Sequence, residues 1–121
     1  MPGDRMRRVN EALREVLSAR IAAGLKDPRI GFVTVTAVET SSDLRHARVF
    51  VSVLGDEDER AETLAGLESS RGLLQATIAS ELRLKHTPAL QFAHDEALER
   101  ALRIKRLLEE TDVDEPEGEP R

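Results

Sequence analysis

Four residues, Ser69-Ser70-Arg71-Gly72, interrupt apolar residues that recur at helical spacing from about residue 57 to residue 85. Glycine inside a helix costs roughly 1 kcal/mol relative to alanine, and neighbouring serines compete for backbone hydrogen bonds. We call this segment the helix joint (Ser69–Gly72) and predict that it breaks or sharply kinks the helix. A kink exposes the amide groups at the positive start of the second helix, where small residues let a phosphate or sugar approach closely. The joint therefore suits binding of a nucleic-acid backbone, although glycine in a helix connection also serves turn geometry alone.

Basic side chains near the helix joint and on the first predicted helix could neutralise phosphates. Arg71 lies in the joint, and Arg83 and Lys85 extend the positive charge at the far end of the second helix. Arg7 and Arg14 lie seven residues apart and share a flank of the first helix. The ordinary alternative for any one of these arginines is solvated helix surface. The candidate RNA-binding residues are Arg7, Arg8, Arg14, Ser70, Arg71, Gly72, Arg83 and Lys85.

The sequence contains no recognisable catalytic or metal-binding pattern. The histidines at positions 46, 86 and 94 have no i, i+4 pairing and no accompanying ligand cluster. Ser41–Asp43 falls in a predicted hairpin turn, where serine and aspartate serve backbone hydrogen bonding. The acids between Gly55 and Glu62 begin a predicted helix, where they meet the positive end of its dipole. We therefore expect no enzyme, no catalytic residues, no metal or other cofactor, and no small-molecule substrate.

The elements that position these residues follow from hydrophobic periodicity. We expect helices over residues 5–23, from residue 57 to the joint, over 72–83 and from the Asp95 cap to about 108, with strands over 32–40, 46–54 and from Pro88. The first two strands should form a hairpin. Alternate residues of the second strand are aliphatic and should pack against helices: Ala47, Val49, Val51 and Val53. The order α-β-β-α-α-β-α predicts an α+β fold, with helices on one face of a three-stranded sheet.

Composition favours one folded domain with a charged extension. The 121 residues include no cysteine and no apolar run long enough for a signal peptide or membrane span, so we expect a cytoplasmic protein without a membrane partner. Net charge is -5, but residues 109–121 carry seven acids and one arginine, which leaves residues 1–108 at +1. We expect a domain over residues 1–108 and a disordered acidic tail over 109–121.

Longer stretches of the chain resemble a known family. KH domains clamp nucleic acid with a GxxG loop between two helices, whereas this chain has S-x-G. The stretches "KDPRIGFVTVTAVETSSDLRHARVFVSVLGDEDE" and "SRGLLQATIASELRLKHTPALQFAHDEALERALRI" resemble the ribosome-binding factor A family. They contain Asp27-Pro28-Arg29 before the first strand, a Ser-x-Asp-Leu hairpin, and an "RLxxxPxLxFxxD" run from Arg83 to Asp95. That family usually has A-x-G at the joint, so Ser70 departs from its pattern. We expect this departure to affect the exact angle of the kink rather than the RNA-binding role of the joint.

The resemblance implies a KH-like domain of the second type in a bacterial small-subunit assembly factor. Such a factor is not an enzyme; it binds the immature free 30S subunit late in assembly, contacts 16S rRNA, promotes processing of that RNA and is released before translation. We expect a monomer. With no Trp or Tyr, and with Phe32, Phe50 and Phe92 in predicted strands, the sheet lacks an aromatic stacking platform. A rival interpretation is a protein-interaction module whose acidic segments, residues 55–62 or 109–121, recruit a basic partner.

Overall fold

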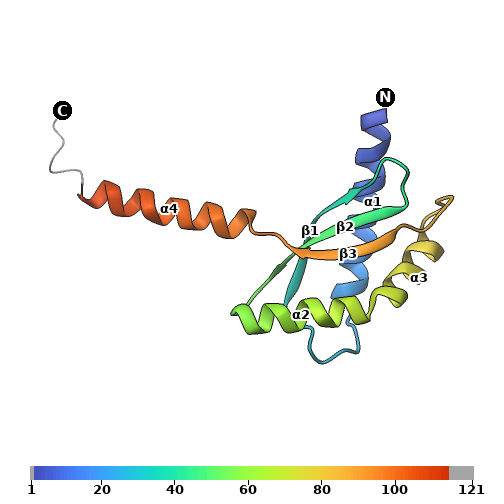
Figure 1. Ribbon diagram of the computed structural model, residues 1–121, viewed down its shortest axis with the longest axis horizontal. Coiled ribbons are helices and arrows are strands. Elements are labelled where there is room, and N and C mark those ends of the chain that lie inside the picture. Colours follow the sequence, from blue (N-terminus) through green and yellow to red (C-terminus); the bar gives the residue numbers. More distant parts are fainter. Residues whose placement is uncertain (1, 115–121) are drawn as a thin grey trace.

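The chain follows the predicted order α-β-β-α-α-β-α in a computed structural model that describes residues 2–114 (Figure 1). The elements are α1 (Pro2–Ala22), β1 (Val33–Thr40), β2 (His46–Val53), α2 (Glu57–Ser69), α3 (Arg71–Glu81), β3 (Ala89–His94) and α4 (Ala97–Asp114). The predicted α+β class and the interrupted helix pair are confirmed. The second helix of that pair ends at Glu81, two residues earlier than predicted, because Leu82 is already in an extended conformation.

The sheet has the strand order β1-β2-β3, with β2 in the centre. β1 and β2 form the predicted antiparallel hairpin, and β3 pairs parallel to β2. The hairpin turn uses its polar residues locally: the Ser41 amide donates to the His46 carbonyl oxygen at 2.8 Å, and the Asp43 carboxylate accepts from the Arg45 amide at 3.0 Å. A parallel pair needs a long crossover connection. Here α2 and α3 form that crossover, so the helix joint lies on one side of the sheet.

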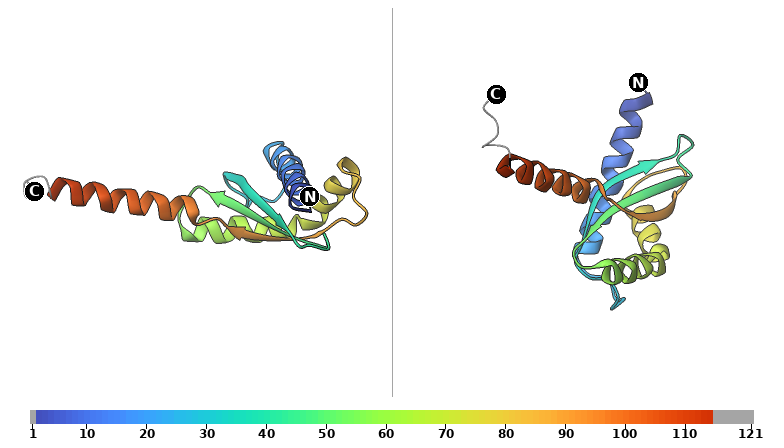
Figure 2. Two further views of the ribbon diagram at one scale, coloured as in Figure 1. Left: turned by 90° about the horizontal axis from the view of Figure 1, so that it is seen from above. Right: turned by 60° about the vertical axis from the view of Figure 1, so that its left-hand side comes forward.

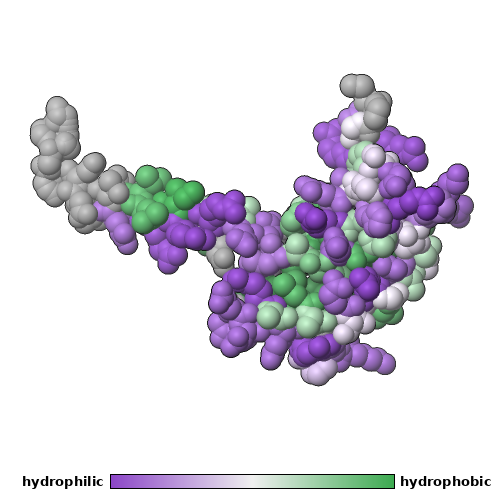
Figure 3. Space-filling view, in the orientation of Figure 1, coloured by the Kyte–Doolittle hydropathy of each residue, from purple (hydrophilic) through white to green (hydrophobic). Residues whose placement is uncertain are grey.

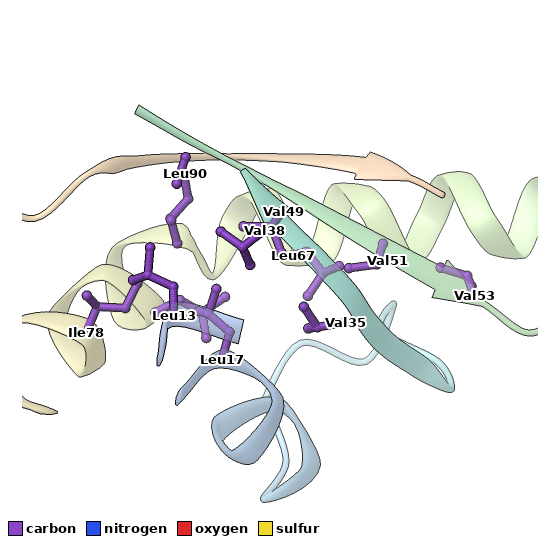
Figure 4. Close-up of a cluster of buried hydrophobic side chains, with 12 residues drawn as sticks. Leu13, Leu17, Val35, Val38, Val49, Val51, Val53, Leu67, Ile78 and Leu90 are labelled. Carbon is purple, nitrogen blue, oxygen red and sulfur yellow. The ribbon is translucent and has the colours of Figure 1, made fainter. Parts of the chain in front are cut away.

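The hydrophobic core lies between one sheet face and the helices α1, α2 and α3 (Figure 4). All four aliphatic residues predicted on one face of β2 are buried: Ala47, Val49, Val51 and Val53. Leu13 and Leu17 of α1, Leu67 of α2, and Leu74 and Ile78 of α3 are fully buried against this face. The core is aliphatic throughout, and it fixes both helices that flank the joint.

The last helix, α4, projects away from the sheet instead of covering it (Figures 1 and 2). Asp95 fixes its start: the Thr36 hydroxyl donates to one carboxylate oxygen at 2.6 Å, and the other accepts from the Ala97 amide at 2.9 Å. The predicted apolar stripe of this helix is consequently exposed, with Ile104 at 51% and Leu108 at 60% (Figure 3).

The helix α4 continues to Asp114, past the boundary at residue 108 that the sequence pattern predicts. No proline or glycine occurs between that boundary and Pro116, so nothing in the backbone chemistry stops the helix at residue 108. The remainder of the predicted acidic tail, residues 115–121, lies outside the described residues.

Candidate nucleic-acid interface

The helix joint is a break of one residue. Ser70 alone is non-helical, with φ -91° and ψ 4°. Its amide donates to the carbonyl oxygens of Gly66 and Leu67, both at 3.0 Å, and its own carbonyl accepts from the Leu74 amide at 3.0 Å. No side chain caps α3 at this position. The first amide groups of a helix have no intrahelical partner, so the start of α3 can accept an anion.

Gly72, in the joint, and Gly66, one turn before it, have different roles. A Cβ atom built on Gly72 meets no protein atom within 4 Å, and the residue is exposed. A Cβ on Gly66 would lie only 2.6 Å from Cγ1 of Ile30. Gly66 is therefore required by internal packing, whereas the space next to Gly72 is open to an external group.

The Arg71 side chain is partly exposed at the joint, and it also contacts other residues of the protein. Its guanidinium lies 3.1 Å from a carboxylate oxygen of Glu68 and 3.5 Å from the carbonyl oxygen of Leu90. The side-chain oxygen of Gln75, one turn further along α3, accepts from the amide of Leu90 at 3.1 Å. Arg71 and Gln75 thus attach α3 to the outer edge of β3. The Arg71 side chain is still 48% exposed, so it remains accessible to a ligand.

The other predicted basic residues do not cluster at the joint. Arg83 and Lys85 are exposed but lie beyond the end of α3, which at 1.5 Å per residue places them about 15 Å along the helix from the joint. Arg7 and Arg8 lie near the N-terminal end of α1, which Figure 1 shows at the opposite side of the molecule from α2. The structure therefore separates the predicted residues into three groups.

The α1 arginines differ in their partners. Arg7 pairs with Asp4 at 2.8 Å, and Arg14 forms an ion pair with Glu11. The hydrogen bond from Arg14 lowers the pKa of Glu11 below its ordinary value. Arg8 is exposed and forms no ion pair with any side chain that the structure describes. Arg8 is therefore the most available cation of this group.

One basic residue at the joint was missed by the sequence pattern. Arg29, in the turn between α1 and β1, donates a hydrogen bond to the Ser69 hydroxyl at 2.8 Å. The two residues are 40 positions apart, so no local periodicity indicates the contact. Arg29 also pairs with Asp27 at 2.6 Å, and this guanidinium lowers the pKa of Asp27 to about 2.

Aromatic side chains do not form a stacking surface on the open face of the sheet. Phe92 packs against the core, and Phe50 is the one phenylalanine within a strand on the opposite face. The prediction that Phe32 lies in a strand is wrong: β1 begins at Val33, and Phe32 is 74% exposed just before it. A lone half-buried Phe50 is too little for the multi-base stacking of an RRM.

A cleft of about 570 Å³ lies between the end of α1 and the start of β1. Its walls include Ile21, Leu25, Ile30 and Val33, and no titratable side chain lines it. General acid, general base and ionised nucleophile roles need such a side chain. The cleft therefore has no groups for this chemistry.

The described part of the chain has neither a cluster of metal ligands nor a membrane-spanning helix. Among the side chains that the structure describes, no three histidine, cysteine, aspartate or glutamate residues are grouped closely enough to hold a metal ion. Over the same range, no helix combines the length and apolar character needed to cross a membrane.

Comparison with known proteins identifies the family. Residues 5–108 match the family described as Ribosome-binding factor A. The chain is 47% identical to Ribosome-binding factor A of Halothermothrix orenii over 122 residues, covering 98% of this chain and 100% of that protein. The crystal structure of ribosome-binding factor A from Thermus thermophilus is similar with a TM-score of 0.68 and 29% identity, covering 76% of this chain and 97% of that one.

A second structural relative was described in a complex. It is a homology model of Thermus thermophilus ribosome binding factor A fitted into a cryo-EM map of a 30S–RbfA complex. The similarity has a TM-score of 0.59 and 31% identity, over 72% of this chain and 91% of that one. The family match spans most of the chain, and the fold agrees with it. The chain belongs to the ribosome-binding factor A family.

Proposed function

We propose that this protein binds the immature free 30S subunit as a monomer, contacts 16S rRNA, and assists late maturation and processing of that RNA. The observation that carries the proposal is the exposed helix joint, with open space at Gly72, in a chain of the ribosome-binding factor A family. The Thermus relative described in a 30S–RbfA complex supports the choice of the small subunit.

The joint would contact the RNA backbone rather than the bases. The amide groups at the start of α3 are suited to a phosphate, and the side chain of Arg71 stands beside them. Arg8, Arg83 and Lys85 would contribute separate phosphate contacts at a distance from the joint. If about four phosphates are neutralised, the logarithm of the binding constant on single-stranded RNA should fall with the logarithm of salt concentration at a slope near -3.

Recognition would depend on the shape of the assembled subunit. The contacts proposed above are to phosphates, which position a protein on nucleic acid but carry no sequence information. Without a stacking platform, short isolated oligonucleotides should bind weakly. We also propose that residues 1–108 form the RNA-binding domain, and that the seven acids of residues 109–121 keep that segment away from RNA.

The rival function is recruitment of a basic protein by the acidic segment at residues 55–62. The described contacts of these acids stabilise the start of α2 and give no separate support for a binding role. Asp56 and Glu59 form a capping box at the start of α2: each side chain accepts from the other residue's amide, at 2.8 and 2.9 Å. Glu57 and Asp58 lie in the same first turn, where acids complement the helix dipole. Helix stability alone accounts for these acids.

Co-sedimentation with free 30S subunits, followed by crosslinking, tests the proposal. The protein should sediment with the free subunits, and crosslinks from the joint should map to RNA. Crosslinks confined to ribosomal proteins would favour the rival, and failure to sediment would contradict the proposal. Arg71→Glu would not test the joint cleanly, because Arg71 also contacts Glu68 and the carbonyl oxygen of Leu90 in β3.

A further inference from the structure

The loop before β1 packs directly against the last turns of α2. The Thr63 hydroxyl oxygen accepts from the amide of Gly31 at 3.1 Å and donates to the carbonyl oxygen of Arg29 at 3.3 Å. Thr63 is buried. At Gly66 the approach is so close that a Cβ atom would lie 3.3 Å from Cγ of Asp27. The loop is therefore held in place, and so is the side chain of Arg29 that extends from it toward the helix joint.

Three of the five N–H groups of the Arg29 guanidinium are engaged. Nε lies 3.0 Å from Oδ1 of Asp27, while Nη2 lies 2.6 Å from Oδ2 of Asp27 and 2.8 Å from the Ser69 hydroxyl oxygen. Nη1 has no hydrogen-bond partner among the groups that the structure describes. The Arg29 side chain is 45% exposed, whereas that of Asp27 is 15% exposed. The carboxylate thus holds the Nε/Nη2 edge of the guanidinium, Ser69 takes the second N–H of Nη2, and the two N–H groups of Nη1 remain without a partner.

We propose that Arg29 binds an RNA phosphate beside the helix joint, with Asp27 and Ser69 holding its guanidinium in place. This inference rests on the proposed function, and it adds a binding residue that lies outside the sequence-predicted set. The N–H groups of a guanidinium donate charge-assisted hydrogen bonds to phosphate oxygens, and Nη1 is available for such a contact. A side chain that is already immobilised loses little entropy on binding. Because Ser69 adjoins the one-residue break at Ser70, the phosphate would lie next to the α3 amides.

The negative charge of Asp27 does not prevent Arg29 from binding a phosphate. Its carboxylate faces the engaged edge of Arg29 and also accepts from the Arg29 amide at 2.9 Å. A phosphate at Nη1 would therefore approach from the edge of the guanidinium that Asp27 leaves open.

The test is the salt dependence of binding to free 30S subunits, measured for full-length variants. Arg29→Ala should weaken binding about tenfold and reduce the steepness of the log-log salt slope by about 0.7 to 0.9. Arg29→Lys retains a charge, so it should keep the slope while losing part of the affinity. Ser69→Ala removes one contact that holds the guanidinium, so a smaller loss of affinity at unchanged slope is expected. Arg45→Ala, the same change at the exposed hairpin turn, is the matched control and should alter the slope less.

Three results would overturn the inference. The first is unchanged affinity of Arg29→Ala. The second is weakened affinity at an unchanged slope, since Arg29 would then only support the joint. The third is an equal slope change in Arg45→Ala, which would indicate a general effect of charge. Circular dichroism identifies an unfolded Arg29→Ala. In that case Arg29→Lys and Ser69→Ala decide: both should lose part of the affinity at an unchanged slope, and wild-type affinity of both would overturn the inference. Absence of binding by the wild type would contradict the proposed function itself, so the two failures are distinguishable.

Discussion

Replacing Gly72 with alanine should separate stability from binding at the helix joint. The added Cβ meets no protein atom within 4 Å, and the residue lies in the first turn of α3. Alanine is favoured over glycine in helices by roughly 0.5 to 1 kcal/mol, so the free energy of unfolding should rise by about that amount. For a domain of this size the melting temperature should then rise by roughly 2 to 8 °C.

The same methyl group would occupy the space through which an RNA backbone approaches the joint. Loss of one hydrogen bond between an α3 amide and a phosphate is worth about 1.5 kcal/mol, so binding to free 30S subunits should weaken about tenfold. The assay is a binding titration at fixed salt, with melting temperature measured on the same preparation. Gly3→Ala is the matched control, because a Cβ at Gly3 also meets no protein atom within 4 Å but lies in α1.

The informative result is therefore opposite changes in two measurements. A higher melting temperature with weaker binding, together with unchanged binding of Gly3→Ala, supports the role of the joint. A higher melting temperature with wild-type affinity would refute the reasoning, because the joint would then tolerate a side chain where we place the RNA.

Three further predictions concern the stability of the fold. Gly66→Ala should destabilise the protein by roughly 1 to 3 kcal/mol in denaturant unfolding, because the new Cβ would lie 2.6 Å from Cγ1 of Ile30; an unchanged midpoint would contradict the packing described. Asp56→Ala removes the acceptor of the α2 capping box and should lower the free energy of unfolding by about 1 kcal/mol, measured by calorimetry. The hydrogen bond from Thr36 lowers the pKa of Asp95, so the stabilisation that it provides is lost as pH falls through that lowered pKa. Thr36→Val should raise the pKa of Asp95 in an NMR titration and reduce the loss of stability with falling pH, and an unmoved pKa would contradict this assignment.

Local patterns in the sequence predict several features of the fold correctly. Alternation along β2 identifies its buried face, because side chains on a strand point to opposite sides in turn. The serines and glycine of the helix joint indicate the break through backbone propensity alone. The acids at the start of α2 are explained by the helix dipole and by a capping box that spans four residues. In each case the responsible interactions lie within a few residues.

Features that depend on distant contacts could not be predicted in the same way. Arg29 and Ser69 meet across 40 residues, and nothing near either residue indicates the other. The apolar stripe of α4 has the same periodicity as that of a buried helix. Periodicity alone does not show whether another part of the same chain packs against the stripe. Asp95, just before this helix, is attached to the sheet by a hydrogen bond from Thr36, which is 59 residues away in the sequence. The wide separation of the predicted arginines likewise depends on how α1 and α3 pack.

The most direct measurement is a cryo-EM map of this protein bound to immature free 30S subunits. We predict that Ser70–Gly72 lies against the 16S rRNA backbone, with a phosphate within hydrogen-bonding distance of the first amides of α3. A map in which the helix joint faces solvent or a ribosomal protein, while another surface meets the RNA, would contradict this prediction.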